Sequence, residues 1–88
     1  MIFITLGKYK MKPTKESNAM AMKGFEQMAN EGVKFITQYW TLGKYDFVAV
    51  AEAKDEKTMM KAVLRWGDMI STQTLVAVPT EEAMKLVE

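Results

Sequence analysis

Residues 33–53 read VKFITQYWTLGKYDFVAVAEA, and this stretch decides the fold. Residues typical of β-strands fill positions 33–42 and 45–53, on either side of Gly43-Lys44. A two-residue connection with glycine first suits a type II′ turn, whose twist matches that of the flanking strands. The stretch therefore predicts an antiparallel hairpin with its turn at residues 43–44.

An amphipathic helical segment lies on each side of this hairpin. Before it, Ser17-Asn18 is expected to cap a helix that runs to Asn30, because short polar side chains accept hydrogen bonds from the first free N–H groups of a helix. After it, Asp55 is expected to cap a second helix over about residues 56–69. Apolar residues recur at three- and four-residue spacing in both segments, so each helix has one face for a core.

Two further strands and a short helix complete the chain. Residues 1–9 (MIFITLGKY) and 72–78 are rich in β-branched residues, and Pro79-Thr80 opens a terminal helix. Right-handed crossovers then place the first and third strands in the middle of the sheet and both main helices on one face. The chain is predicted to be one α+β domain over residues 1–88, a ferredoxin-like βαββαβ plait with a four-stranded antiparallel sheet.

The composition excludes several classes of function. The 88 residues contain no cysteine and no histidine, so thiolate chemistry, zinc sites and a histidine general base are excluded within the chain. We predict no catalytic constellation, no metal site and no cofactor. The apolar run at the start of the chain, residues 1–4, is too short for a signal peptide or a membrane span, so the expected location is cytoplasmic, without a membrane partner.

The hairpin region also resembles a known family. Residues 40–53, WTLGKYDFVAVAEA, together with Lys15-Glu16-Ser17 and Thr72-Gln73-Thr74-Leu75, are similar to the GYD-domain family. The resemblance implies a dimeric α/β-barrel assembly and says little about activity. A weaker similarity, in the Gly-x-Tyr-Asp hairpin and the Thr-x-Thr strand, links the chain to the ligand-binding modules of Lrp/AsnC regulators. Those modules dimerise through their sheets and bind small effectors, which implies a binding role.

One face of the predicted sheet has no helix to cover it. Side chains alternate along a strand, so the branched aliphatic residues of the central strands form one set and the aromatic and alanine residues form the other. We expect the branched set to face the helices and the second set to form an open apolar face. Such a face normally marks an interaction surface, here for a second copy of the chain. The candidate dimer-interface residues are Phe3, Phe47, Ala49 and Ala51.

The candidate ligand-binding residues lie around the hairpin. Tyr39, Trp40 and Tyr45 flank it, and Asp46 begins a central strand. The competing interpretation is cross-strand packing for the aromatic residues and a hydrogen bond from a nearby backbone N–H for Asp46. The first hypothesis is a homodimer, or a higher homo-oligomer, with a small-molecule-binding or accessory role.

Two alternatives from other classes remain. A cofactor-free monooxygenase-like enzyme of the dimeric α/β-barrel type would hold its substrate between sheet and helices, with Tyr39, Trp40, Tyr45 and Asn18 as candidates. A pocket of about 300 Å³ or more would favour a ligand or a substrate.

The second alternative is a module resembling the RNA-recognition motif, which stacks bases of single-stranded RNA on aromatic residues of the first and third strands, here Phe3 and Phe47. The net charge of +1 and the carboxylate of Asp46 oppose phosphate binding, so nucleic acid is not the expected partner.

Overall fold

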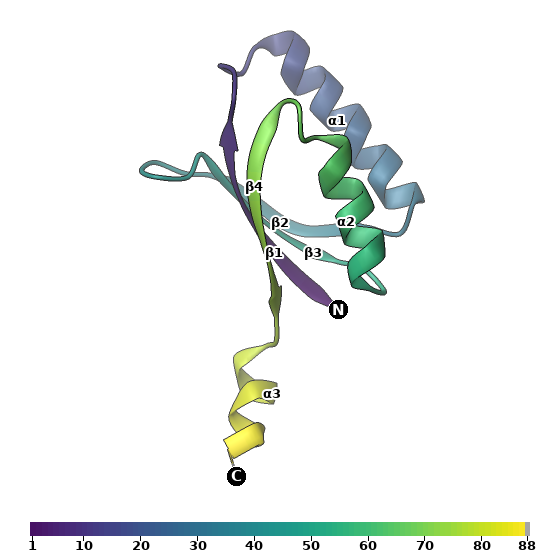
Figure 1. The fold of residues 1–88 in the computed structure, drawn as a ribbon, viewed down its shortest axis with the longest axis vertical. Helices are drawn as coiled ribbons and strands as arrows, with labels where there is room; N and C mark the ends of the chain where they lie inside the picture. The colour runs from purple at the N-terminus through teal and green to yellow at the C-terminus, as the bar shows by residue number, and fades with distance from the viewer. Residues whose placement is uncertain (88) are drawn as a thin grey trace.

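The structure, a computed structural model, describes residues 1–87 and has the predicted order of strands and helices (Figure 1). The elements are β1 (Ile2–Tyr9), α1 (Lys15–Asn30), β2 (Lys34–Trp40), β3 (Phe47–Glu52), α2 (Glu56–Arg65), β4 (Ile70–Ala77), α3 (Thr80–Met84) and a short 3-10 helix, η1 (Lys85–Val87). The four strands pair antiparallel in the order β2-β3-β1-β4, and α1 and α2 cover the same side of the sheet. The α+β plait is confirmed.

The two main helices begin at polar caps, one of them earlier than predicted. The cap of α1 is Thr14, whose Oγ1 accepts a hydrogen bond from the backbone N–H of Ser17 at 3.1 Å. In return the N–H of Thr14 donates to Ser17 Oγ at 2.8 Å, so Ser17 is the third residue of a capping box rather than the cap itself. For α2 the predicted cap is confirmed, because Asp55 Oδ1 accepts from the N–H of Thr58 at 2.9 Å.

The second helix ends four residues before its predicted limit. Trp66 follows the last helical residue, and its carbonyl oxygen accepts hydrogen bonds from the N–H groups of Met69 and Ile70 at 3.0 and 3.1 Å. These bonds turn the chain directly into β4, which begins at Ile70 rather than at residue 72.

The hairpin turn lies where the sequence predicts it. Trp40 pairs with Phe47, and the N–H of Thr41 donates to the carbonyl of Asp46 at 2.8 Å, so the turn is centred on residues 43–44. Gly43 has a φ of 105°, which only glycine adopts without strain. The tip of the hairpin extends beyond the edge of the sheet (Figure 1).

The predicted assignment of the two sheet faces is wrong. Phe3 and Ala51 belong to the buried core, together with Met28 of α1 and Met59 and Ala62 of α2. The other two candidate interface residues share this side: Ala49 is buried, and both Ala49 and Phe47 line the space beneath the helices. All four residues proposed for a dimer interface therefore face the helices of their own chain.

The physical reason for this orientation is the size of the helix side chains. Phe25, Met28, Met59 and Trp66 project toward the sheet, and they require small groups opposite them. The side of the sheet that faces the helices meets this need with the buried alanines of β3, Ala49 and Ala51.

The open face is nonetheless apolar. Its centre consists of branched aliphatic residues of β1, β3 and β4, and polar residues pair with them nearer its edges. The aliphatic residues are Ile2, Ile4, Leu6, Val48, Val50 and Leu75, and the polar partners include Glu52, Gln73 and Thr37. The aromatic residues of β1 and β3, which an RNA-binding plait would use for stacking, lie under the helices instead. The RNA-binding alternative loses the platform on which it depended.

A C-terminal arm, defined as residues 78–87, extends beyond the end of β4 and away from the two-layer body (Figure 1). Neither α3 nor η1 contains a buried residue, and Leu86 and Val87 are 81% and 88% exposed. The arm accounts for much of the long dimension of the molecule, which measures 49 × 31 × 18 Å. Within residues 1–87, no helix combines the length and the apolar character that crossing a membrane requires.

Candidate functional site

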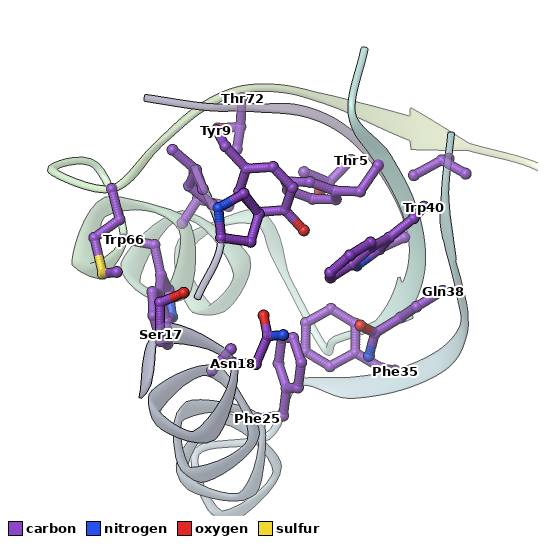
Figure 2. A pocket seen from close by; sticks show the side chains of 18 of the residues that line it. Thr5, Tyr9, Ser17, Asn18, Phe25, Phe35, Gln38, Trp40, Trp66 and Thr72 are labelled. Carbon is purple, nitrogen blue, oxygen red and sulfur yellow. The ribbon is translucent and has the colours of Figure 1, made fainter. Parts of the chain in front are cut away.

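A cavity of about 470 Å³ lies between the sheet and the two main helices (Figure 2). Its sheet side combines short side chains, including Thr5, Ala49 and Thr72, with the rings of Tyr9, Phe35, Trp40 and Phe47. Opposite them, α1 contributes Phe25 and α2 contributes Ala62. Small side chains of both layers, including Thr5, Ala49 and Ala62, border this space.

Aromatic rings form one end of this cavity. The rings of Tyr9 and Trp40 meet edge to face with centroids 5.9 Å apart, and Tyr9 and Phe47 are tilted at 5.5 Å. Phe25 and Phe35 form a second edge-to-face pair at 5.1 Å. Such pairs stabilise one another beyond simple burial, so they give the cavity a defined aromatic wall.

Gly7 makes this wall possible. A Cβ atom at Gly7 would lie 2.1 Å from Cζ of Phe47, so only glycine allows the Phe47 ring to lie against β1. Phe47 in turn supports Tyr9, whose pKa is raised, first by burial and second by the negative charge of Asp46. The phenol of Tyr9 therefore stays protonated over a wide pH range.

Asp46 acts as a brace for the end of β1. Its Oδ2 accepts a hydrogen bond from the N–H of Tyr9 at 2.8 Å, and its own N–H donates to the carbonyl of Gly7 at 2.7 Å. This is the structural interpretation weighed from the sequence. Asp46 is not among the described residues that line the cavity, so it positions the aromatic wall from behind.

The other predicted residues divide between the cavity and the opposite side of the sheet. Trp40 and Asn18 line the cavity, although Trp40 is 67% exposed. Tyr39 borders the cavity but pairs with Val48 of the open face and is 62% exposed, so its ring lies on the side of the sheet away from the helices. The fourth, Tyr45, lies apart from them, because its hydroxyl donates to Gln73 Oε1 at 2.9 Å. Tyr45 is thus not brought together with the other candidates.

Few polar groups interrupt the apolar lining. Side-chain amides come from Asn18 and Gln38, and Figure 2 shows both beside the aromatic wall. The hydroxyl of Thr5 is paired with that of Thr74 at 3.0 Å. Among the described lining residues Lys12 is the one charged side chain, and it belongs to the connection between β1 and α1.

Trp66 is the lining residue with the most unusual polar group. Its indole Nε1 is buried and has no hydrogen-bond partner among residues 1–87. Sequence reasoning missed Trp66, Tyr9 and Phe35 as site residues, because their convergence depends on contacts between distant elements. The usable signal was their aromatic character, because apolar pockets are lined predominantly by hydrophobic and aromatic side chains.

Comparison with protein families identifies the family of the chain. The model of the GYD domain matches residues 1–87, which is nearly the full length. The chain belongs to the GYD domain family.

One curated relative of this GYD domain is a protein of Thermus thermophilus called glutamine synthetase and cystathionine beta-lyase binding protein. It is 42% identical over 53 residues, which cover 58% of this chain and 56% of the relative. The matched part therefore spans little more than half of the relative's length.

Proposed function

We propose that this GYD domain is a homodimeric binding protein for a small, mainly apolar molecule. The observation that carries the proposal is the cavity between sheet and helices. Its volume of about 470 Å³ falls in the range of known ligand sites, and it combines an aromatic wall with a few amides and hydroxyls. Lining residues such as Met11, Met22 and Trp40 are exposed, so a small molecule could enter the space from solvent.

The open sheet face and the C-terminal arm support the homodimer. Branched aliphatic residues cover the centre of the open face, and the apolar residues of the arm are exposed. A stable interface usually buries about 800 Å² on each partner, which a four-stranded sheet face and an arm can supply together. Stacking the two open faces about 10 Å apart would remove both from water.

The binding proposal has a direct test in a matched pair of variants. Ala21 lines the cavity from α1, whereas Ala19 is exposed on the same helix. Native mass spectrometry of protein purified from its source should show a retained small molecule. Ala21→Leu should lose it by filling the cavity, and Ala19→Leu should keep it. Retention of the same molecule by both variants would place it outside the cavity and contradict the proposal.

A second candidate function is an accessory role on an enzyme. The name of the Thermus thermophilus relative supports it, because that protein is called a binding protein for two enzymes. The test is sedimentation of this GYD domain with glutamine synthetase from its own organism. A faster-sedimenting complex would support the accessory role, and independent sedimentation of the two proteins would contradict it.

A further inference from the structure

We propose that the ligand of the cavity is an apolar molecule with one carboxylate, which the hydroxyl of Tyr9 and the ammonium group of Lys12 hold at the mouth of the cavity. This inference rests on the proposed binding function and adds the charge and the head group of the ligand. It begins from the charges on the lining, where Lys12 is the one cation and no described residue carries a carboxylate.

The hydroxyl of Tyr9 is a free hydrogen-bond donor inside the cavity. Figure 2 shows its oxygen directed into the cavity, and among residues 1–87 the hydroxyl has no hydrogen-bond partner. The oxygen is not among the buried unpaired side-chain atoms of this part of the chain, so a ligand can reach it. Because the raised pKa keeps the phenol protonated, it would donate to a carboxylate in a strong, charge-assisted hydrogen bond.

Lys12 differs from the other lysines of the connection between β1 and α1. Residues 8–15 contain four lysines and no acidic residue. Lys8 follows the alternation of β1 onto the open face, Lys10 Nζ donates to the carbonyl of Gly67 at 2.6 Å, and Lys15 is exposed at the start of α1. Lys12 lines the cavity and forms no ion pair among residues 1–87, so its charge is available to a ligand.

Tyr9 and Lys12 can act on one head group. Three residues of chain separate their Cα atoms by at most about 11 Å, a span that the two long side chains can cover. The ring of Tyr9 meets that of Trp40, which is 67% exposed, so the donor lies next to solvent. Asn18, on the other side of the cavity in Figure 2, adds an amide donor. A carboxylate held here would stay partly hydrated while the apolar body entered the cavity, which limits the cost of burying its charge.

The single cation narrows the class of the head group. One positive charge balances a carboxylate, whereas a phosphate monoester at neutral pH carries about two negative charges. An ammonium group would meet Lys12 and find no carboxylate on the described lining. Asp46 does not supply one, because its Oδ2 accepts from the N–H of Tyr9 and it is not among the lining residues.

Three matched probes separate the head group from the apolar body. Diphenylacetate, diphenylacetamide and diphenylethylamine have the same two rings and end in a carboxylate, a neutral amide and an ammonium group. In calorimetric titrations at neutral pH we expect diphenylacetate to bind roughly fivefold to tenfold more tightly than diphenylacetamide, and diphenylethylamine to bind most weakly.

Two pairs of variants test the two residues. Lys12→Gln should weaken diphenylacetate about threefold to fivefold and leave diphenylacetamide within about twofold, whereas Lys15→Gln, with the same loss of charge, should change neither. Tyr9→Phe should weaken diphenylacetate about tenfold and diphenylacetamide less, because a hydrogen bond to a charged oxygen is the stronger one. Tyr45→Phe is its control, since the Tyr45 hydroxyl is engaged with Gln73.

The outcomes distinguish this inference from the binding function itself. Equal binding of diphenylacetate and diphenylacetamide by the unaltered protein, or equal losses in Lys12→Gln and Lys15→Gln, would overturn the inference while leaving the cavity as a binding site. A source-derived ligand without an acidic group would overturn it as well. If none of the three probes bound, and no source-derived ligand were retained, the proposed function would fail too.

Discussion

At the scale of single residues, glycines determine where the aromatic side chains of the site can lie. Gly7 admits the ring of Phe47 and Gly24 admits the ring of Trp66, and in each case the methyl group of an alanine would overlap the ring. Neither glycine has a positive φ, so the requirement is for space rather than for backbone freedom. The site therefore depends on two residues that carry no functional group.

Gly24→Ala should destabilise the protein by about 1–3 kcal/mol through overpacking against Trp66, despite the gain of about 1 kcal/mol that alanine normally brings to a helix interior. Urea unfolding measures this free energy. In a Trp66→Phe background the cost should fall, because phenylalanine lacks the ring atoms that collide. An equal cost in both backgrounds would show that the Trp66 contact is not responsible.

Tyr9 gives a prediction in alkaline solution. Its folded pKa is raised, so above the unfolded value of about 10 the folded protein binds more protons than the unfolded chain, and stability should fall as the pH rises through this range. Tyr9→Phe should reduce that fall, measured by urea unfolding at a series of pH values. Asp46→Asn should lower the pH at which this loss of stability is complete. The substitution removes the negative charge that, together with burial, raises the pKa of Tyr9. A Tyr9→Phe profile identical to that of the unaltered protein would contradict the assignment.

At the scale of elements, the order of strands, the place of the hairpin turn and the Asp55 cap could all be predicted from local sequence. The faces of the sheet could not, because both alternating sets of β1 and β3 are apolar and the period of two does not distinguish them. What decides the orientation is the fit of Phe25 and Met59 against Ala51 in the core, a property of several elements at once. For the same reason the sequence indicated Trp40 and Asn18 for the site but not Trp66.

The cap of α2 gives a prediction in acid. Hydrogen bonds from the side chain and then the backbone of Thr58 lower the pKa of Asp55, so its contribution to stability is present above the unfolded value of about 3.9 and is lost as the pH falls through the folded value. Asp55→Ala should lower the melting temperature at neutral pH by several degrees and by much less in acid, measured by circular dichroism.

Thr14→Ala, at the uncharged cap of α1, is the control for this effect. Its cost of about 1 kcal/mol should not follow the titration of a carboxylate. If the two caps lost their effect together in acid, general acid unfolding rather than the Asp55 charge would be the cause.

At the scale of the whole molecule, two adjacent residues of β4 test the proposed dimer. Leu75 pairs with Ile4 on the open face, and Val76 pairs with Phe3 on the helix side, yet both are exposed at the sheet edge. Leu75→Asp should convert a dimer to a monomer in light scattering, because it buries a charge between the sheets. Val76→Asp should leave the dimer intact. A monomeric unaltered protein, or equal behaviour of the two variants, would contradict face-to-face stacking.

In the middle of the central strands the two sides differ, with Thr5, Gly7, Ala49 and Ala51 toward the helices and branched aliphatic residues toward the open face. Neighbouring positions should consequently tolerate different kinds of replacement. In a saturation mutagenesis of β1 and β3, the codons of Thr5, Gly7, Ala49 and Ala51 should reject bulk, and the codons between them should accept bulk but reject charge. The alternation of tolerated substitutions along each strand would thus show which face of the sheet each position belongs to.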